Sequence, residues 1–306
     1  MRREFTLTLV ALALLALTAC EKEPASVHDG ERYPILFGNY ETRATAGLDD
    51  LKANGFKVYA YFEGNTGNSH TFEKEVTYSD AQNVWGYEGL EYWIPGATYW
   101  FKAFYPTMPS AGTLTVDNTS STQSFTIADF DISQQEDIMV ATAKCSVADG
   151  AKFPTTGSSV VDLDFQHLLA CVVIELKSEI ANVTVSEISL EDIAQTGNYS
   201  NGIWTSEQTV TINKQYSGEA LVKDAKDFVD VTDGGFLVIP EAIGGRQKMI
   251  IRTSHKNYEV VIPVITWELG KKYTYTLTIK QENIVFNEPG VDIWDEENAT
   301  GSVVIK

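Results

Sequence analysis

The sequence has few of the residues and none of the short motifs on which most enzymes and metal proteins rely. Only three cysteines and four histidines occur in 306 residues. They form neither a Cys-x-x-Cys pair nor a His-Glu-x-x-His motif, so the usual pattern of a zinc site is missing. The Gly-x-Ser-x-Gly nucleophile motif, the P-loop and the dinucleotide-binding glycine pattern are missing too. We therefore predict a protein that is not an enzyme, with no catalytic residues, no metal and no cofactor.

Basic side chains are also scarce. The chain has 23 Lys and Arg against 42 Asp and Glu, which gives a formal net charge of −19. A surface with this charge repels nucleic acid, so nucleic acid is excluded as a partner. Two stretches, 131–137 and 292–298, are rich in acidic residues. Neither has the spacing of an EF-hand loop, and calcium binding is left open.

No apolar run is long enough to cross a bilayer, which takes about 20 residues. The longest one extends from Phe5 to Leu17 and follows Arg2 and Arg3. A positive head, an apolar stretch and small residues are the order of a secretory signal. The stretch ends in Leu-Thr-Ala-Cys at Cys20, which resembles the acylation box of bacterial lipoproteins. We predict a lipoprotein signal peptide over 1–19 and lipidation of Cys20; an ordinary secretory signal is the alternative.

Two cysteines remain once Cys20 is assigned to lipid. Cys145 and Cys171 would then be the only thiols of an exported protein. In an oxidising compartment they either form a disulfide or stay buried as small apolar residues. Neither lies in a tight spacing pattern, which favours buried, unpaired thiols, but pairing is left open.

Short alternating segments, rather than amphipathic helices, fill the rest of the chain. Residues 20–32 are polar and are interpreted as a tether. After them, segments rich in strand formers follow one another, separated by Asn, Gly, Asp, Ser and Pro. Only Leu48–Asn54 is expected to be helical, with Gly55 as its cap. The pattern predicts an all-β fold of two β-sandwich domains in tandem, over 33–153 and 154–306.

The expected strands follow one another at short intervals along the chain. They are Tyr33–Phe37, Phe56–Phe62, Phe72–Tyr78, Trp85–Tyr87, Thr98–Phe104, Leu114–Val116, Ser124–Ile127, Ile138–Ala141, Val160–Phe165, Ala170–Leu176, Val183–Leu190, the position of Trp204, Thr209–Ile212, Phe236–Ile239, Lys248–Thr253, Tyr258–Ile262, Lys272–Ile279 and Ile284–Phe286.

Seven segments, in order along the chain, resemble the fimbrillin (Mfa-like) family, the subunits of type V pili. They are the box at Cys20, residues 35–37 with 42–44, residues 55–61, residues 100–106, residues 137–141, residues 161–169, and residues 236–240 with 267–275. One departure is Glu241, where the family often has Gln. The resemblance implies two transthyretin-like β-sandwiches. It also implies a structural subunit of surface fimbriae at the cell outer membrane, supporting adhesion.

The resemblance further implies assembly by donor-strand exchange. In the family, a lipoprotein precursor is cut at an arginine after its first strand, and a strand of a neighbouring subunit takes that place. In this chain the implied cut lies between Arg43 and Ala44, and it would release Ile35 and Phe37. An open sheet edge presents unpaired N–H and C=O groups, so it readily accepts an added strand. A solvated turn at Arg43 is the alternative.

A donor strand is expected within 291–306. Val291 and Ile293 share one strand face, and Val303 and Ile305 share another, so these four are the candidate anchors. An ordinary last strand that stays in its own domain is the alternative. The implied partners are other fimbrillin-type subunits, in a homo- or hetero-polymer, and the outer membrane through the lipid. A host protein or glycan is a further partner class.

A surface protein that never polymerises is the other function that fits the sequence. It would be a lipid-anchored pilus anchor or a glycan-binding protein. Aromatic residues are dense around Trp93 and Trp100, and exposed rings can stack on sugars. Alternating aromatics also fill the core of a sandwich, which is the stronger interpretation. His167, flanked by apolar residues, is expected to be a half-buried structural imidazole.

Overall fold

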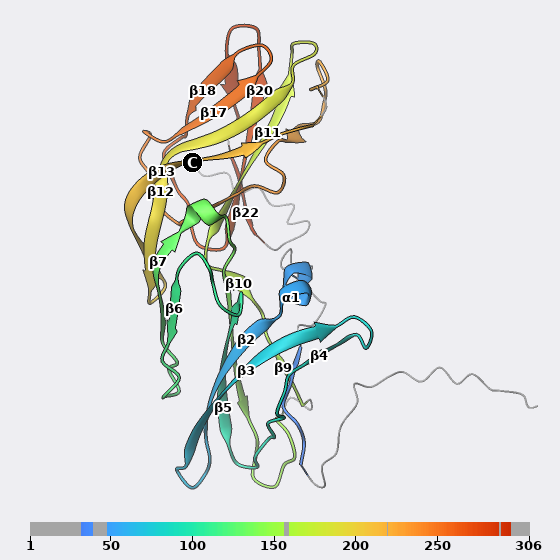
Figure 1. Ribbon diagram of the computed structural model, residues 1–306, viewed down its shortest axis with the longest axis vertical. Helices are drawn as coiled ribbons and strands as arrows, with labels where there is room; N and C mark the ends of the chain where they lie inside the picture. The colour runs from blue at the N-terminus through green and yellow to red at the C-terminus, as the bar shows by residue number, and fades with distance from the viewer. Residues whose placement is uncertain (1–31, 39–47, 156–158, 219, 288, 295–306) are drawn as a thin grey trace, which may run out of the picture.

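The computed structural model describes residues 32–38, 48–155, 159–218, 220–287 and 289–294 (Figure 1). The molecule is elongated, with a blue-to-green lobe at one end and a yellow-to-red lobe at the other. Among these residues the regular elements are strands, apart from one α-helix and one short 3-10 turn, which confirms the all-β prediction. Among the described residues, no helix has the length and apolar character needed to cross a membrane.

The N-terminal lobe is built on a six-stranded antiparallel sheet. Its strands, in spatial order, are β10 (Gln166–His167), β8 (Met139–Ser146), β5 (Thr98–Tyr105), β2 (Phe56–Glu63), β3 (Ser69–Ser79) and β4 (Val84–Gly86). One face alternates into the lobe's core: Phe56, Val58 and Ala60 of β2 are buried, as are Phe101 and Ala103 of β5. The period of two therefore places one apolar face inward, as alternation requires.

A short helix, α1 (Leu48–Asn54), leads into this sheet at the predicted bounds. Leu51 is buried against the lobe. The N–H of Gly55 donates to the carbonyl of Leu51 at 2.8 Å, and the φ of Gly55 is +73°. A left-handed residue that closes the last turn is the usual glycine cap, so the cap prediction is confirmed.

Replacing Gly55 by alanine should lower the free energy of unfolding by about 2 kcal/mol or more. The left-handed backbone alone costs an alanine about 1–2 kcal/mol. In addition, the new Cβ would lie 2.5 Å from the carbonyl oxygen of Val76. Gly67→Ala is the matched control, because Gly67 has φ +75° and nothing within 4 Å. Urea denaturation should find Gly55→Ala the more costly of the two; equal costs would contradict the steric argument.

The C-terminal lobe packs two sheets around a second core. One sheet places β11 (Ala170–Ser178) parallel to β20 (Lys271–Ile279). On the outer edge of β11 lie β14 (Val229–Asp230) and β15 (Phe236–Val238); on that of β20 lie β21 (Ile284–Phe286) and β22 (Gly290–Ile293). The other sheet has the order β18 (Asn257–Val261), β17 (Lys248–Thr253), β12 (Val185–Ser200), β7 (Phe125–Asp131) and β6 (Thr113–Val116), with β13 (Ile203–Gln215) also on β12. A small pair, β16 (Ala242–Ile243) and β19 (Ile265–Thr266), completes the lobe.

The sheets interlock across the predicted domain boundary at residues 153 and 154. Strands β6 and β7 precede the boundary, yet β7 pairs with β12 of the C-terminal lobe. Conversely, β10 follows the boundary and pairs with β8. A third apolar cluster, which includes Phe130, Ile138 and Tyr199, lies at this joint. The boundary therefore does not coincide with a break between sheets, and the tandem division stays a prediction.

A side-chain amide reinforces the joint. Gln135 follows the short 3-10 turn η1 (Ile132–Gln134). Its Nε2 donates to the carbonyl of Leu237 at 3.0 Å, and its Oε1 accepts from the N–H of Leu237, also at 3.0 Å. The amide thus makes with Leu237 of β15 the two hydrogen bonds that a neighbouring strand would make. It links the loop before β8 to the C-terminal lobe.

Both described cysteines are free thiols, as the sequence favours. Cys171 is buried in β11, and its Sγ lies 3.3 Å from the carbonyl oxygen of Gly234. Cys145 in β8 is partly buried. Burial raises the pKa of Cys171 to about 12 and also raises that of Cys145. Since the thiolate is the reactive form, neither thiol is set up for chemistry.

Cys171 should resist alkylation in the folded protein. With a pKa of about 12, only about one thiol in ten thousand is ionised at pH 8, against about a quarter for a free cysteine. Timed iodoacetamide treatment followed by mass spectrometry should find Cys171 modified at least about a hundredfold more slowly than in urea. Rapid native labelling of Cys171 would contradict its burial.

Candidate functional site

The segment that begins the described chain lies in a groove of the N-terminal lobe. Strand β1 (Leu36–Gly38) pairs parallel with β9 (Val160–Asp162), with Leu36 opposite Val160 and Gly38 opposite Asp162. The N–H of Leu36 donates to the carbonyl of Ser159 at 3.1 Å. These two strands form a sheet of their own, so β9 has β1 as its only neighbour among the described strands.

The other wall of the groove is formed by residues 87–93. The N–H of Ile35 donates to the carbonyl of Glu91 at 2.8 Å, and the N–H of Trp93 donates to the carbonyl of Tyr33 at 2.9 Å. We call the channel between β9 and residues 87–93 the first-strand groove. Residues 33–38 are thus held on both sides by main-chain hydrogen bonds, as an inserted strand would be.

Tyr87 adds a side-chain contact to the main chain of the bound segment. Its hydroxyl donates to the carbonyl of Ile35 at 2.6 Å. Burial raises the pKa of Tyr87 to about 12, so the hydroxyl keeps its proton at neutral pH. The wall itself is fixed to β3, because Lys74 Nζ lies 3.0 Å from Glu91 Oε1 and donates to the carbonyl of Gly89 at 2.7 Å. The hydrogen bond between Tyr87 and Ile35 cannot be predicted from the sequence, since the two residues are 52 positions apart.

The segment fills the core of the lobe with two side chains. Ile35 is 0% exposed and Phe37 is 4% exposed, as their alternation predicts. The Phe37 ring lies 5.5 Å from the ring of Tyr87 and 5.7 Å from that of Phe101, between centroids. Burying each large apolar side chain contributes about 1.5–3 kcal/mol. Loss of the segment would therefore uncover both apolar core and strand edge.

Several predicted site residues lie outside the described residues. They are Cys20, Arg43, Ala44, Val303 and Ile305. The predictions of lipidation, cleavage and a terminal donor strand therefore stay predictions. The remaining candidates can be placed.

Val291 and Ile293 lie in β22, at an edge of the C-terminal lobe. They pair with Tyr273 and Lys271 of β20, respectively. Val291 packs, partly buried, against the core of this lobe, whereas Ile293 is 47% exposed. No described strand covers the outer edge of β22. In this structure these two candidate anchors therefore belong to their own chain's sheet.

His167 lies deeper than expected, at the joint between the lobes. It is 3% exposed, so the half-buried interpretation understates its burial. Its Nδ1 lies 2.7 Å from Asp137 Oδ2. The ring stacks on that of Trp294, with centroids 3.7 Å apart and an interplanar angle of 11°. His167 thus joins β10 to the segment after β22, and it has a packing role.

Glu241 takes part in a main-chain contact. Its Oε1 accepts a hydrogen bond from the N–H of Ala194 at 2.7 Å, beside a bulge in β12. Burial raises the pKa of this carboxyl. The amide oxygen of Gln could accept the same bond. This explains why Glu can stand where the resemblance leads us to expect Gln.

The two tryptophans named as sugar-stacking candidates differ in exposure. Trp93 is only 4% exposed. Its ring contacts those of Tyr99 and Phe101, and its Nε1 donates to the carbonyl of Ser159 at 3.2 Å. The stronger interpretation, a core aromatic, is therefore confirmed for Trp93, whose ring is part of the groove wall. Trp100 is partly buried on the outer face of the sheet, with its ring beside that of Tyr61.

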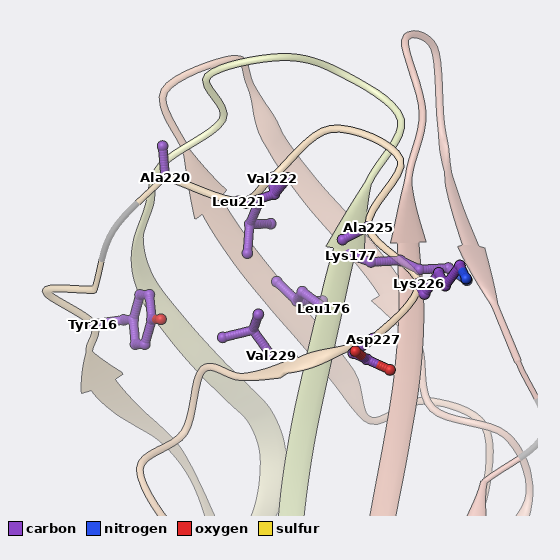
Figure 2. A pocket seen from close by; sticks show the side chains of 10 residues that line it. All are labelled: Leu176, Lys177, Tyr216, Ala220, Leu221, Val222, Ala225, Lys226, Asp227 and Val229. Carbon is purple, nitrogen blue, oxygen red and sulfur yellow. The ribbon is translucent and has the colours of Figure 1, made fainter.

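One cavity, of about 290 Å³, lies at the far end of the C-terminal lobe. Figure 2 shows Leu176, Leu221 and Val229 gathered beneath the loop that follows β13, with Lys226 and Asp227 to one side. The lining is mostly apolar, and its polar side chains are Lys177, Tyr216, Lys226 and Asp227. Within the described ranges, no cluster of three or more His, Cys, Asp or Glu side chains is placed to bind a metal.

Comparisons with known proteins agree with this architecture. A family model described as fimbrillin-like matches residues 42–294. A fimbrial protein from Bacteroides vulgatus has a TM-score of 0.59 and 20% identity, covering 86% of this chain and 99% of that chain. Proteins described as cell adhesion proteins from Bacteroides uniformis and Bacteroides ovatus each have a TM-score of 0.53, with 17% and 14% identity. The first alignment covers 85% of this chain and 98% of the other, and the second 87% and 99%. No curated protein sequence matches.

Proposed function

We propose, since this chain belongs to the fimbrillin-like family, that it is exported as a lipoprotein and polymerises by donor-strand exchange. The family is one of cell-surface fimbrial proteins and not of enzymes. Its members assemble with other fimbrial subunits, so the questions are how this chain is delivered and how it joins its neighbours.

One observation supports strand exchange above all others: the burial of Ile35 and Phe37 on a segment at the start of the lobe. The predicted cut between Arg43 and Ala44 falls after these anchors and before α1. Once the chain is cut there, residues 33–38 are held only by non-covalent contacts. Their departure leaves β9 without a neighbour and two buried sites empty. A strand of another subunit restores both.

Lipidation of Cys20 gives the same cut a second consequence. The acylated precursor is held at the outer membrane, facing the outside. Because Cys20 precedes Arg43, cleavage separates the body of the subunit from its lipid. A single cut therefore frees the subunit and opens its groove, which couples release to assembly.

Treating the purified precursor with an arginine-specific protease should yield a ladder that resists SDS. Buried anchors and a full set of strand hydrogen bonds make such polymers slow to separate. Denaturing electrophoresis without boiling measures the ladder, and Arg43→Gln is the control that should remain monomeric. Clean cleavage after Arg43 that yields monomer only would refute polymerisation.

The donor strand can be tested in the same assay. Val303→Asp combined with Ile305→Asp should abolish the ladder, because each introduces a charge at a buried anchor. Val304→Asp is the matched control, since its side chain lies on the other strand face. A persisting ladder in the double variant would refute this donor and shift attention to Val291 and Ile293.

A pilus anchor that keeps its lipid is the second candidate. It is favoured by the pairing of Val291 and Ile293 within their own sheet. The mature N-terminus on cells separates the two candidates. A chain that starts at Ala44 is a polymerising subunit, whereas one that starts at acylated Cys20 is an anchor.

A further inference from the structure

The first-strand groove is closed to side chains at one position. A Cβ built on Gly38 would lie 2.9 Å from Cγ1 of Val160, closer than real Cβ contacts allow. Val160 belongs to β9, and its short branched side chain has few rotamers with which to move aside. The groove therefore has room for glycine at this position and for little else.

The positions of Ile35, Leu36 and Phe37 in the groove differ from that of Gly38 in the side chains they accept. The sites of Ile35 and Phe37 are fully enclosed and apolar, while Leu36 between them is only partly buried. The hydroxyl of Tyr87 and the carbonyl of Glu91 contact main-chain atoms of Ile35, so these two hydrogen bonds do not depend on the side chain at that position. The groove thus has two apolar sites, one tolerant position between them, and one position that excludes a side chain.

We propose that the first-strand groove selects its incoming strand by the pattern apolar, any residue, apolar, glycine, aligned parallel to β9. The proposal rests on the proposed function, which supplies the incoming strand. It deepens that function, because it specifies which strands are accepted and which partner brings them.

By this rule, the two C-terminal donor candidates of this chain fit the groove less well than its own first strand. Val303 and Ile305 have the apolar spacing, but Lys306 then stands at the glycine position. Val291 and Ile293 have it too, but Trp294 follows them. Neither candidate therefore fits the pattern at its last position, and a strand of another fimbrial subunit with glycine after its second anchor is the better donor. A mixture with such a subunit would polymerise more readily than this chain alone.

Peptide exchange tests the rule on the full chain. A recognition sequence for a site-specific protease is inserted between residues 39 and 47, and the folded protein is cut there. A fluorescent peptide with the sequence of residues 33–38, YPILFG, then competes with the resident segment. Variant peptides carry Gly38→Val or, as the matched control, Leu36→Ala; another peptide has the sequence TGSVVIK of residues 300–306.

The YPILFG peptide should exchange in, and the Gly38→Val peptide should bind about tenfold more weakly or worse, as expected for overpacking a filled site. The Leu36→Ala peptide should stay within about threefold. The tail peptide should bind at least about tenfold more weakly than YPILFG. Val160→Ala in the protein should restore binding of the Gly38→Val peptide, since it removes the methyl groups that block it.

The binding results distinguish failure of the selection rule from failure of strand exchange. Equal binding of the YPILFG and Gly38→Val peptides, or no rescue by Val160→Ala, would overturn the selection rule and leave strand exchange standing. A tail peptide that binds as tightly as YPILFG would overturn the preference for a donor strand from a different subunit. If YPILFG itself does not exchange into the cut protein, both the rule and the proposed function fail.

Discussion

Replacing Phe37 by alanine should lower the free energy of unfolding by about 3–5 kcal/mol, the usual cost of deleting a buried phenylalanine ring. Phe37 is 4% exposed and lies between Tyr87 and Phe101. The cavity cannot close easily, because its walls belong to β5, β9 and residues 87–93, which are held by separate hydrogen bonds. Guanidinium denaturation followed by tryptophan fluorescence measures the loss on the uncut chain.

Leu36→Ala is the matched control for Phe37→Ala. Leu36 is the preceding residue of the same strand and also pairs with β9, but its side chain is only partly buried. It should therefore cost less than half as much. If Phe37→Ala cost no more than Leu36→Ala, the segment would not be part of the core. The energetic basis for exchanging one strand for another would then be lost.

Local pattern predicts most individual elements of this fold. Strands β17 and β21 occupy the predicted residues Lys248–Thr253 and Ile284–Phe286, and α1 occupies Leu48–Asn54. In the two strands, the alternation of apolar and polar residues over a few positions predicts the element. In the helix, the capping glycine directly after it does the same. The information needed is therefore present in a short window of sequence.

The long hairpin of β12 and β13 shows where a short window fails. The sequence predicts strand only at Val183–Leu190, Trp204 and Thr209–Ile212, yet the strands extend to the turn at Asn201 and Gly202. Register shifts between Leu190 and Thr196 interrupt the period of two, so the pattern fades there. The turn did carry a signal: Asn-Gly with φ of 51° and 84° is the preferred two-residue hairpin connection.

The groove could be predicted only in part. Alternation places Ile35 and Phe37 inward, but nothing near them in the sequence identifies the walls that receive them. Tyr87, Glu91 and β9 come from segments about 50 to 125 positions away. Such pairings depend on how the whole chain folds back on itself, and a single sequence does not contain them in readable form. The same holds for the pairing of β7 with β12.

The segment 267–275 is part of the resemblance to the fimbrillin family, and its contacts show what these residues do in the fold. Trp267 is fully buried, and its Nε1 donates to the hydroxyl of Tyr275 at 3.0 Å. The hydroxyl of Tyr273 accepts from the N–H of Glu268 at 2.7 Å and donates to the carbonyl of Thr266 at 2.8 Å. The chain thus turns back on its own aromatic residues.

The turn is also tied to the joint between the lobes. Gly270, at φ +68°, donates its N–H to the carbonyl of Leu169 at 2.9 Å and accepts from the N–H of Trp294 at 3.1 Å. The motif therefore fixes the start of β20 against Leu169, which directly precedes β11, and against Trp294, which directly follows β22. Trp294 directly follows β22, which contains the candidate donor residues Val291 and Ile293. The position of β22 therefore depends on the same turn.

Replacing Trp267 by alanine should destabilise the protein by about 3–5 kcal/mol, through the cavity left by the indole. It should also loosen β22, because the turn that anchors Trp294 loses its support. Denaturation measures the first effect, and hydrogen exchange of the amides of residues 290–294 measures the second.

Tyr275→Phe is the informative comparison, because it keeps the ring and removes only the acceptor of the Trp267 Nε1–H. It should cost about 1–3 kcal/mol, the penalty for one buried donor left unpaired, with little change in exchange at β22. If Trp267→Ala left the exchange of residues 290–294 unchanged, the turn would not control the last strand. The position of β22 would then rest on its pairing with β20 alone, and release of this strand would be independent of the C-terminal core.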